Sequence, residues 1–423
     1  MGREMDERER EMAPGDGEAV GREEGHVQAD AHRVRDEVAS LLGQAALGNP
    51  ATTGRQSHVP MAEPGSPDEA AALLRRAAEA GWRVLPMGAG LAPMDKGPAD
   101  LLVSPRRMAD VVQYEPADLT VEVGAGMLLE ALDGELARHR QWLPILPPGG
   151  GAVTLGGLVA VGLPGALAMA YGGPRDQLLG LTMADARGRV LTLGGRVVKN
   201  VAGFDLVRLA CGSRGTLGLI CRVSFRLHPR PAVDRTLIWT GSTGPELVRL
   251  GRRLAELPFP FATLEIHGRR FGALPELDGG DWAITLRAVG SDAAVQGMVD
   301  AAVEVAGIPE RSLDGPASER FGLAAARDEG AARPQHRRRV RPTELESVLH
   351  GVAMAAGPGD PEGASGSVVA DLRSGMFRRL RARDQGLPPL SSMPGGVRKV
   401  HGGLRRVFDP RGILPGSWRD GWP

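Results

Sequence analysis

The first residues that could do chemistry form a glycine-rich stretch directly after an expected strand. It reads Pro86-Met87-Gly88-Ala89-Gly90-Leu91. Because small residues allow the backbone to come close to a phosphate, and because consecutive N–H groups form an anion-binding concavity, this stretch could bind a phosphate group. A tight turn explains the same residues equally well, so the stretch alone does not identify a site.

A second glycine-rich stretch, residues 147–160, adds a side-chain hydroxyl. Its prolines and glycines form a turn that delivers Thr154 and the Gly156-Gly157 pair. The turn thus combines a hydroxyl donor with exposed backbone N–H groups, as a pyrophosphate requires. A flexible surface loop is the alternative, and it is less favoured because apolar residues resume at Leu158.

Two further stretches contain polar residues in unusual positions. Residues 171–176 read Tyr-Gly-Gly-Pro-Arg-Asp and include Arg175 and Asp176. Further on, Lys199 and Asn200 are adjacent, although the chain has only three lysines and two asparagines. With that composition, an adjacent Lys-Asn pair is expected by chance only on the order of 0.01 times. We interpret the pair as required by its position.

Several other nucleotide sites are excluded. The Gly124-Ala125-Gly126 segment is superficially like a dinucleotide-binding fingerprint, but Leu129 stands at its third position and no acidic residue ends a following strand at the usual spacing. No Gly-Lys pair exists, which removes the phosphate loop of ATPases and GTPases. With 51 basic and 51 acidic residues, the charge balance does not favour nucleic acid or an anionic membrane as the main partner.

The histidines predict no metal site. Nine histidines are scattered along the chain, and none forms an HExxH motif. His267 is the nearest candidate for a catalytic base, although a satisfied surface or core histidine is the favoured interpretation. We therefore assign no catalytic residue.

The elements expected around these stretches alternate between helix and strand. Ser66 as N-cap, Pro67 in the first turn and Gly81 as the stop predict a helix. The next expected elements are a strand at 82–87, a strand from residue 119, a helix at 127–140 and a hairpin over 178–195. Such units indicate an α+β or α/β domain.

A change of pattern after Pro229 and Pro231 predicts a domain boundary, with one domain at 36–231 and a second at 232–423. The second domain is expected to be a small antiparallel sheet backed by helices. Its expected strands lie near 236–240, 261–267 and 282–288, and its expected helices near 245–257 and 291–306. Residues 308–365 are expected to be loop-rich, with the basic run at 336–339 a solvated face in preference to an anionic docking patch.

The compartment is inferred from the termini and the cysteines. Residues 1–35 mix Glu, Arg and Gly without an apolar period, so we expect them to be disordered. No apolar run approaches the roughly 20 residues of a spanning helix. The two cysteines, Cys211 and Cys221, do not make a disulfide framework. These features predict a cytoplasmic protein that is soluble, or peripheral to a membrane through partners.

The run from Gly194 to Ile220, GGRVVKNVAGFDLVRLACGSRGTLGLI, resembles the corresponding run of the FAD-binding E subunits of bacterial glycolate oxidases. These subunits are members of the vanillyl-alcohol-oxidase superfamily, which has a PCMH-type FAD-binding domain. The resemblance extends from about Pro67 to Pro231, with VEVGAGMLLEAL, TLGGLVA and YGGPRD in register. A weaker likeness covers the C-terminal segment 404–418, where Leu414 stands in place of the family's Asn.

The resemblance implies an α+β fold, in which a two-subdomain PCMH-type FAD-binding domain is followed by a smaller α+β cap domain. It implies that the 87–91 loop and the 154–157 turn embrace the pyrophosphate of noncovalent FAD, that the 218–221 strand meets the adenine part, and that the cap covers the isoalloxazine. The implied cofactor-binding residues are Met87, Gly88, Ala89, Gly90, Leu91, Thr154, Gly156, Gly157, Arg175, Asp176, Lys199, Asn200, Gly215, Gly218 and Ile220.

Several positions depart from the family pattern. Met87 and Leu91 stand where relatives usually carry Arg and Thr, and the segment before Tyr171 lacks the usual Asn and Arg. Each change removes a polar contact, so FAD binding is expected to be weaker than in relatives. Lys199 either contacts the cofactor or pairs with Asp205 within its hairpin.

The function implied by the resemblance is that of the FAD-binding subunit of a glycolate (2-hydroxy acid) oxidase or dehydrogenase, active with a catalytic D subunit and an iron–sulfur subunit. This chain has no cysteine cluster, so an iron–sulfur centre would belong to a partner. Two alternatives remain: a non-catalytic assembly subunit with weakened FAD binding, and a stand-alone FAD-dependent oxidoreductase with another substrate.

Overall fold

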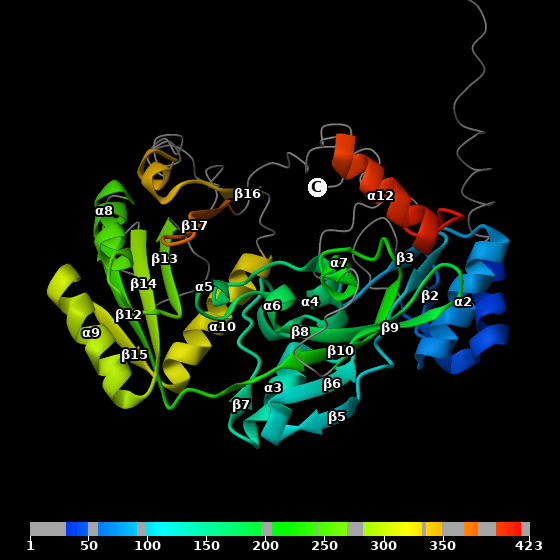
Figure 1. Cartoon of the computed structure of the whole chain (residues 1–423), viewed down its shortest axis with the longest axis horizontal. Helices are drawn as coiled ribbons and strands as arrows, with labels where there is room; N and C mark the ends of the chain where they lie inside the picture. Colours follow the sequence, from blue (N-terminus) through cyan, green and yellow to red (C-terminus); the bar gives the residue numbers. More distant parts are fainter. Residues whose placement is uncertain are drawn as a thin grey trace, which may run out of the picture.

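The computed structural model describes residues 31–49, 58–90, 99–195, 205–241, 244–268, 282–331, 336–348, 368–379 and 395–415. They form two lobes, each built on β-sheet (Figure 1). Leu91, Lys199 and Asn200 of the expected site lie outside these ranges. Within the described ranges, no helix is both long and apolar enough to cross a bilayer.

A small sheet begins the first lobe. Its order is β1 (Leu47–Gly48), β2 (Met61–Ala62), β4 (Leu101–Val103) and β3 (Val84–Pro86). Helix α2 (Pro67–Ala80) packs beside it and confirms the expected capping: Ser66 Oγ accepts a hydrogen bond from the Glu69 amide, and Gly81 ends the helix with φ 72°.

The chain is helical over residues 31–42, so the expectation of disorder up to residue 35 is wrong at its end. Val34 and Val38 are one turn apart and are buried in the core that α2 also lines. Two valines among charged residues give too weak a period to predict this helix from the sequence.

An antiparallel five-stranded sheet forms the rest of the first lobe. Its order is β5 (Val111–Glu115), β6 (Thr120–Gly124), β10 (Leu219–Arg226), β8 (Leu178–Ala184) and β9 (Val190–Gly194). The expected hairpin over 178–195 is confirmed as β8 and β9. The apolar core beneath this sheet includes residues of α3 (Leu129–Ala137), α4 (Leu155–Val161) and α7 (Leu206–Ala210).

Short elements connect these parts. They are the 3-10 turns η1 (Gln44–Ala46), η2 (Pro116–Asp118) and η3 (Gly150–Ala152), the helices α5 (Ala168–Tyr171) and α6 (Pro174–Gln177), and the paired strands β7 (Gln141–Trp142) and β11 (His228–Pro229).

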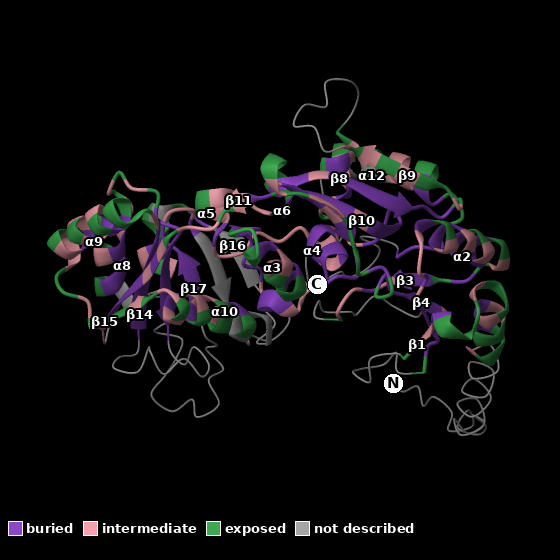
Figure 2. Cartoon of the chain, turned by 90° about the horizontal axis from the view of Figure 1, so that it is seen from below, coloured by how far each residue is buried: buried purple, intermediate pink, exposed green. Residues whose placement is uncertain are grey.

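The second lobe contains a seven-stranded antiparallel sheet. Its order is β15 (Arg311–Asp314), β12 (Val233–Gly241), β14 (Trp282–Gly290), β13 (Thr263–Gly268), β17 (Val368–Asp371), β18 (Met376–Arg379) and β16 (His336–Arg339). Helices α8 (Gly244–Ala255) and α9 (Asp292–Ala306) cover its apolar face, and α10 (Pro316–Ala331) lies on the other (Figures 1 and 2). The helices and strands expected up to residue 306 are confirmed.

The expectation of loops after residue 308 is wrong for several described segments. Strand β15, helix α10, strand β16 and the turn η5 (Pro342–Glu344) all lie there. The basic run at 336–339 is strand β16, paired with β18, rather than a loop. Helix α10 buries mainly Phe321 and Ala326, so its apolar period is faint in the sequence.

Helix α12 (Gly395–Phe408) returns the chain to the first lobe. Phe408 is buried in the core of the five-stranded sheet, and its carbonyl accepts a hydrogen bond from the Ala186 amide. Beyond the helix, the carbonyl of Ile413 accepts a hydrogen bond of 2.7 Å from the Val84 amide at the start of β3. The last described segment is thus attached to the small sheet.

Candidate functional site

Two of the expected glycine-rich segments touch each other at Gly88 and Thr154. A Cβ atom added to Gly88 would lie 2.4 Å from Thr154 Oγ1 and 3.3 Å from Gly157 Cα. Contacts this short exclude any side chain at position 88 unless the turn moves. The loop after β3 and the turn before α4 therefore form one surface.

Thr154 is held in place by its neighbours. Its Oγ1 caps α4 by accepting a hydrogen bond of 3.2 Å from the Gly157 amide. The Leu155 amide donates to Met127 and the Gly156 amide to Ala125, at 2.9 and 2.8 Å. The Gly156 and Gly157 amides are therefore bonded within the chain, and the expectation that they are exposed donors is wrong. The hydroxyl proton of Thr154, a residue that is 2% exposed, is not used by these contacts.

Close packing explains the glycines of the Gly124-Ala125-Gly126 segment, which does not match a dinucleotide-binding fingerprint. A Cβ atom added to Gly126 would lie 2.1 Å from the carbonyl oxygen of Pro105, and one added to Gly156 would lie 2.8 Å from Ala125 Cβ. These glycines allow the end of β6 to pack between the turn at 105–109 and the Thr154 turn.

The loop after β3 exposes backbone donors. Among the described residues, the amides of Gly88, Ala89 and Gly90 have no hydrogen-bond partner, and Gly90 has φ 78°. Three consecutive open N–H groups next to a hydroxyl form an anion-binding concavity. The Met87 side chain does not join it, because Met87 is 8% exposed and packs against Met61, Leu85 and Leu102.

A third segment, residues 212–218, completes this surface. The Arg214 amide donates to Ala160 at 2.8 Å and so fastens the segment to α4. Gly215 has φ 79°, and an added Cβ would lie 3.0 Å from Pro86 Cβ, directly before the open loop. Gly218 passes against strand β8, where an added Cβ would lie 2.2 Å from the Ala184 carbonyl oxygen. The Ile220 side chain instead points into the core.

Arg214 was not among the expected site residues. It has φ 54°, a rare value for a residue with a side chain, and burial lowers the pKa of its guanidinium. A desolvated cation between Ser213 and Gly215 is suited to an anionic group. Its positive φ cannot be recognised from the sequence.

Arg175 and Asp176 lie on α6, which contacts α4. Asp176 Oδ2 accepts a hydrogen bond of 2.9 Å from the Gly173 amide and closes a local turn. Both side chains are exposed, and both are close enough to Cys211 to influence its pKa. The described structure therefore gives Asp176 a turn-closing contact.

The C-terminal turn is organised by one buried carboxylate. Asp409 accepts hydrogen bonds from the Ile413 and Leu414 amides, at 2.9 and 3.1 Å, and from Arg405 at 2.9 Å. Leu414, which replaces the family's Asn, is 2% exposed and packs in the core that includes Val34. The departure at this position is thus compensated by apolar packing.

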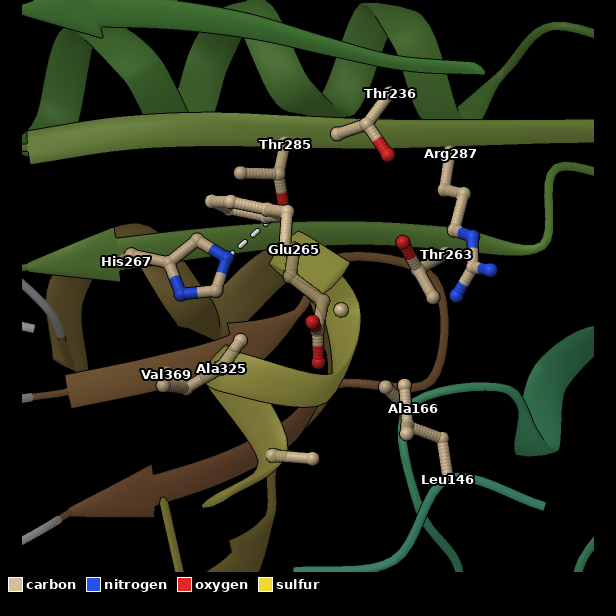
Figure 3. A pocket seen from close by; sticks show the side chains of 13 residues that line it. Leu146, Ala166, Thr236, Thr263, Glu265, His267, Thr285, Arg287, Ala325 and Val369 are labelled. Atoms are coloured by element: carbon tan, nitrogen blue, oxygen red, sulfur yellow. Dashed lines mark hydrogen bonds between the residues drawn. The ribbon is translucent and has the colours of Figure 1, made fainter. Parts of the chain in front are cut away.

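The seven-stranded sheet has a polar face that is buried under α10. Thr236, Glu265, His267, Thr285 and Arg287 from β12, β13 and β14 lie around a cavity of about 30 Å³ (Figure 3). His267 Nε2 is 2.9 Å from Thr285 Oγ1. A volume of this size suits one or two water molecules. Burying polar side chains costs free energy, so a cluster of them inside a lobe indicates a use beyond packing. This face is therefore a second candidate site.

An ion pair neutralises the cation on this face. Arg287 Nε donates to Asp234 Oδ1 at 2.9 Å, and Ser318 Oγ donates to the same oxygen at 2.6 Å. Arg287 and Asp234 are only 7% and 6% exposed. Glu265, which is also buried, brings a second carboxyl group to the face.

Apolar packing and α10 connect the two lobes beside this cavity, where Trp142 lies in one buried cluster with Ala262 and Val289 of the second lobe. Tyr171 lies edge-on to Trp142 and to His228, with ring centroids 5.4 and 5.5 Å apart. Burial raises the pKa of the Tyr171 phenol; the charge of Asp234 raises it further, and that of Arg287 lowers it. On the other side, the Gly149 amide donates to the Ala326 carbonyl at 2.8 Å, which attaches α10 to the turn before Thr154.

Comparison with known proteins supports the fold. Residues 60–194 match the family model described as FAD binding domain. Glycolate oxidase subunit GlcE of Escherichia coli (strain K12) is 39% identical over 128 residues, which are 30% of this chain and 37% of that protein. D-lactate dehydrogenase of Archaeoglobus fulgidus is 31% identical over 174 residues, 40% of this chain and 38% of that protein. The chain thus matches less than half the length of either relative.

A solved structure of alkyldihydroxyacetonephosphate synthase has the same fold, with a TM-score of 0.68 at 17% identity over 90% of this chain and 85% of that one. The amides open at Gly88 to Gly90, beside the Thr154 hydroxyl, fit the pyrophosphate of FAD. The α+β fold and the cofactor expected from the resemblance are confirmed, and residues 60–194 form an FAD-binding domain of the PCMH type.

Proposed function

We propose that this chain is the FAD-binding subunit of a 2-hydroxy acid oxidase or dehydrogenase, with glycolate as the first substrate to test. The contact between Gly88 and Thr154 carries the proposal, because it places three open amides and a hydroxyl together. The likeness to glycolate oxidase subunits GlcE and GlcD supports the substrate class.

In this proposal the 87–90 loop, the 154–157 turn and the 212–218 segment hold the pyrophosphate, with Arg214 as an additional cation. Lys199 and Asn200 stay candidates because an adjacent Lys-Asn pair is improbable in a chain with so few of either residue. Bound FAD supplies hydride and electron transfer. We propose that residues 36–231 form the cofactor domain and residues 232–423 the cap, with 404–418 returning to the cofactor side.

We propose that substrate oxidation is completed by a catalytic partner of the D type, with an iron–sulfur subunit as the onward acceptor. Substrate carboxylates are bound by cations that are not already neutralised. On the described polar face, Arg287 is paired with Asp234, and Glu265 adds a carboxyl group. This face is therefore unsuited to the carboxylate of a substrate. The free thiols Cys211 and Cys221 support a cytoplasmic location.

A flavin absorbance spectrum of the purified chain tests the proposal, alone and after co-expression with the similar D-type protein of the same organism. We expect yellow protein that releases free FAD on denaturation, and glycolate-dependent reduction of a dye only in the complex. A chain that stays colourless in both preparations, even after incubation with FAD, would contradict cofactor binding.

A non-catalytic assembly subunit is the second candidate function. The buried side chains of Met87 and Leu414 favour it, because the polar groups of relatives at these positions are lost. Normal assembly by a colourless chain would identify this alternative, whereas dye reduction by the isolated chain on another 2-hydroxy acid would identify a stand-alone enzyme.

A further inference from the structure

Helix α12 has an exposed apolar stripe beside the face that packs on the first lobe. Val400 and Val407 are 64% and 50% exposed, although they lie in the same helix as the buried Phe408. Gly396 and Gly403 fall on the same side, and a Cβ atom added to either would meet nothing within 4 Å. The four residues follow a spacing of four, three and four, which keeps them on one helix face.

The surface around this stripe is basic. Residues 395–408 contain four Lys or Arg residues and no acidic residue. Lys399 and Arg406 are exposed. Arg187 and Arg189, on the turn between β8 and β9, are exposed as well, and they donate to the carbonyls of Arg406 and Val407 at 3.0 and 3.3 Å.

Among the described residues, the carboxylates bonded within this region neutralise Arg189 and Arg405 and leave the other basic residues without a counter-charge. Asp185 pairs with Arg189, and Asp409 pairs with Arg405, but both carboxylate side chains are fully buried. Lys399, Arg406 and Arg187 have no ion-pair partner among the described residues. Val190, which is 38% exposed at the edge strand β9, extends the apolar part of the surface toward these arginines.

The composition of the stripe favours a protein over a lipid surface. Helices that lie in a membrane interface bury large groups such as Trp, Phe and Leu. The stripe on α12 consists of Gly and Val, which form a smooth surface that another backbone can approach closely. A partner that offers small apolar contacts flanked by carboxylates complements it.

We propose that this α12 surface, formed by Arg187, Val190, Lys399, Val400, Arg406 and Val407, binds an acidic face of the partner subunit. The inference rests on the proposed function, since it requires a heteromeric complex. The inference adds the position at which the partner binds and the negative charge of the partner's contacting face. The segment that follows α12 is bonded to β3 through Ile413 and Val84, so the docked partner would lie on a helix connected to the cofactor loop.

The test is co-expression of the full chain with the GlcD-like protein of the same organism, followed by affinity capture and size-exclusion chromatography. The surface variant is Arg406→Glu/Val407→Asp. The matched control is Ile308→Asp/Arg311→Glu, which makes the same chemical changes at exposed residues of the second lobe; Ile308 is 86% exposed. Flavin content and melting temperature of each isolated chain report folding.

We expect the surface variant to lose at least about tenfold in partner affinity, the control to bind like the wild type, and wild-type binding to weaken with added salt. Equal binding by all three chains overturns the inference and leaves the proposed function standing. Absence of wild-type binding overturns both. Flotation with vesicles of phosphatidylcholine and phosphatidylglycerol tests the lipid alternative: vesicle binding lost only in the surface variant, with assembly intact, also overturns the inference.

Discussion

The hydroxyl oxygen of Thr154 fills the space that a side chain on Gly88 would need, so the two residues define how closely the loop after β3 and the α4 turn can approach. Replacement of Gly88 by Ala should push the turn away and weaken FAD binding by about tenfold or more, because overpacking of this kind costs about 1 to 3 kcal/mol. Fluorescence titration of the apoprotein with FAD measures the change.

Gly134→Ala is the matched control for this substitution. Gly134 lies within α3, and an added Cβ would meet nothing within 4 Å. We expect unchanged FAD affinity and a small gain in stability, since Ala is the better helix former. Equal FAD affinity in the Gly88 variant and the wild type would show that the 87–90 loop does not hold the cofactor.

Asp409→Asn should destabilise the first lobe. The carboxylate accepts hydrogen bonds from two amides and from Arg405, and the amide side chain cannot replace all of them. We expect a loss of about 2 kcal/mol in the free energy of unfolding, measured by urea denaturation. Asp300→Asn, which changes only the exposed acceptor of the Gln296 side chain, should cost less than about 0.5 kcal/mol.

The buried pair Asp234–Arg287 should behave differently when one or both partners are removed. Asp234→Leu leaves an unpaired buried cation and should cost about 3 kcal/mol or more. Asp234→Leu/Arg287→Met removes both charges and should recover most of that loss. Thermal unfolding of the two variants measures this recovery, and a double variant no more stable than Asp234→Leu would argue against direct pairing.

The thiols should make the protein sensitive to alkaline pH. Burial raises the pKa of Cys211 to about 11 and that of Cys221 to about 12. Both thiols therefore stay protonated in the folded chain while unfolded thiols ionise from about pH 8.5 upward. The stability that the two protonated thiols contribute to the folded chain is fully present below about pH 8.5 and is lost as the pH rises toward 11 to 12.

Thiol titration at pH 8 checks this expectation. An aromatic disulfide reagent should leave both cysteines unmodified in the native chain and should modify both in guanidinium. Cys211→Ser should flatten part of the alkaline decline in stability. Rapid labelling of the native chain would show that the thiols are more accessible than their burial indicates.

The sequence predicts elements whose signals are local. Helix α2 is recognisable from Ser66, Pro67 and Gly81, because capping and stop signals act within one turn of the chain. The close approach at Gly88 and Thr154 is also recognisable, since glycine and hydroxyl patterns mark positions where two backbone segments come close together. Their contact with each other depends on tertiary packing and is visible only in the structure.

Other features depend on contacts between distant segments. Helix α10 shows a faint period because it rests on a polar sheet face and buries few large residues. The pairing of Asp234 with Arg287 joins residues on neighbouring strands far apart in sequence. The burial of Met87 and Leu414 likewise depends on partners outside their own segments. No pattern within a short window contains this information.

The hydrogen bond from the Gly149 amide to the Ala326 carbonyl couples α10 of the second lobe to the turn before Thr154. If the second lobe swings outward, α10 pulls on the turn that leads into Thr154. Arg230 strengthens this tether, since it bridges Asp133 of the first lobe and Glu319 of α10. Opening of the molecule should therefore also displace the turn that leads into Thr154, so we expect exchange of FAD to be slow whenever the lobes are held closed.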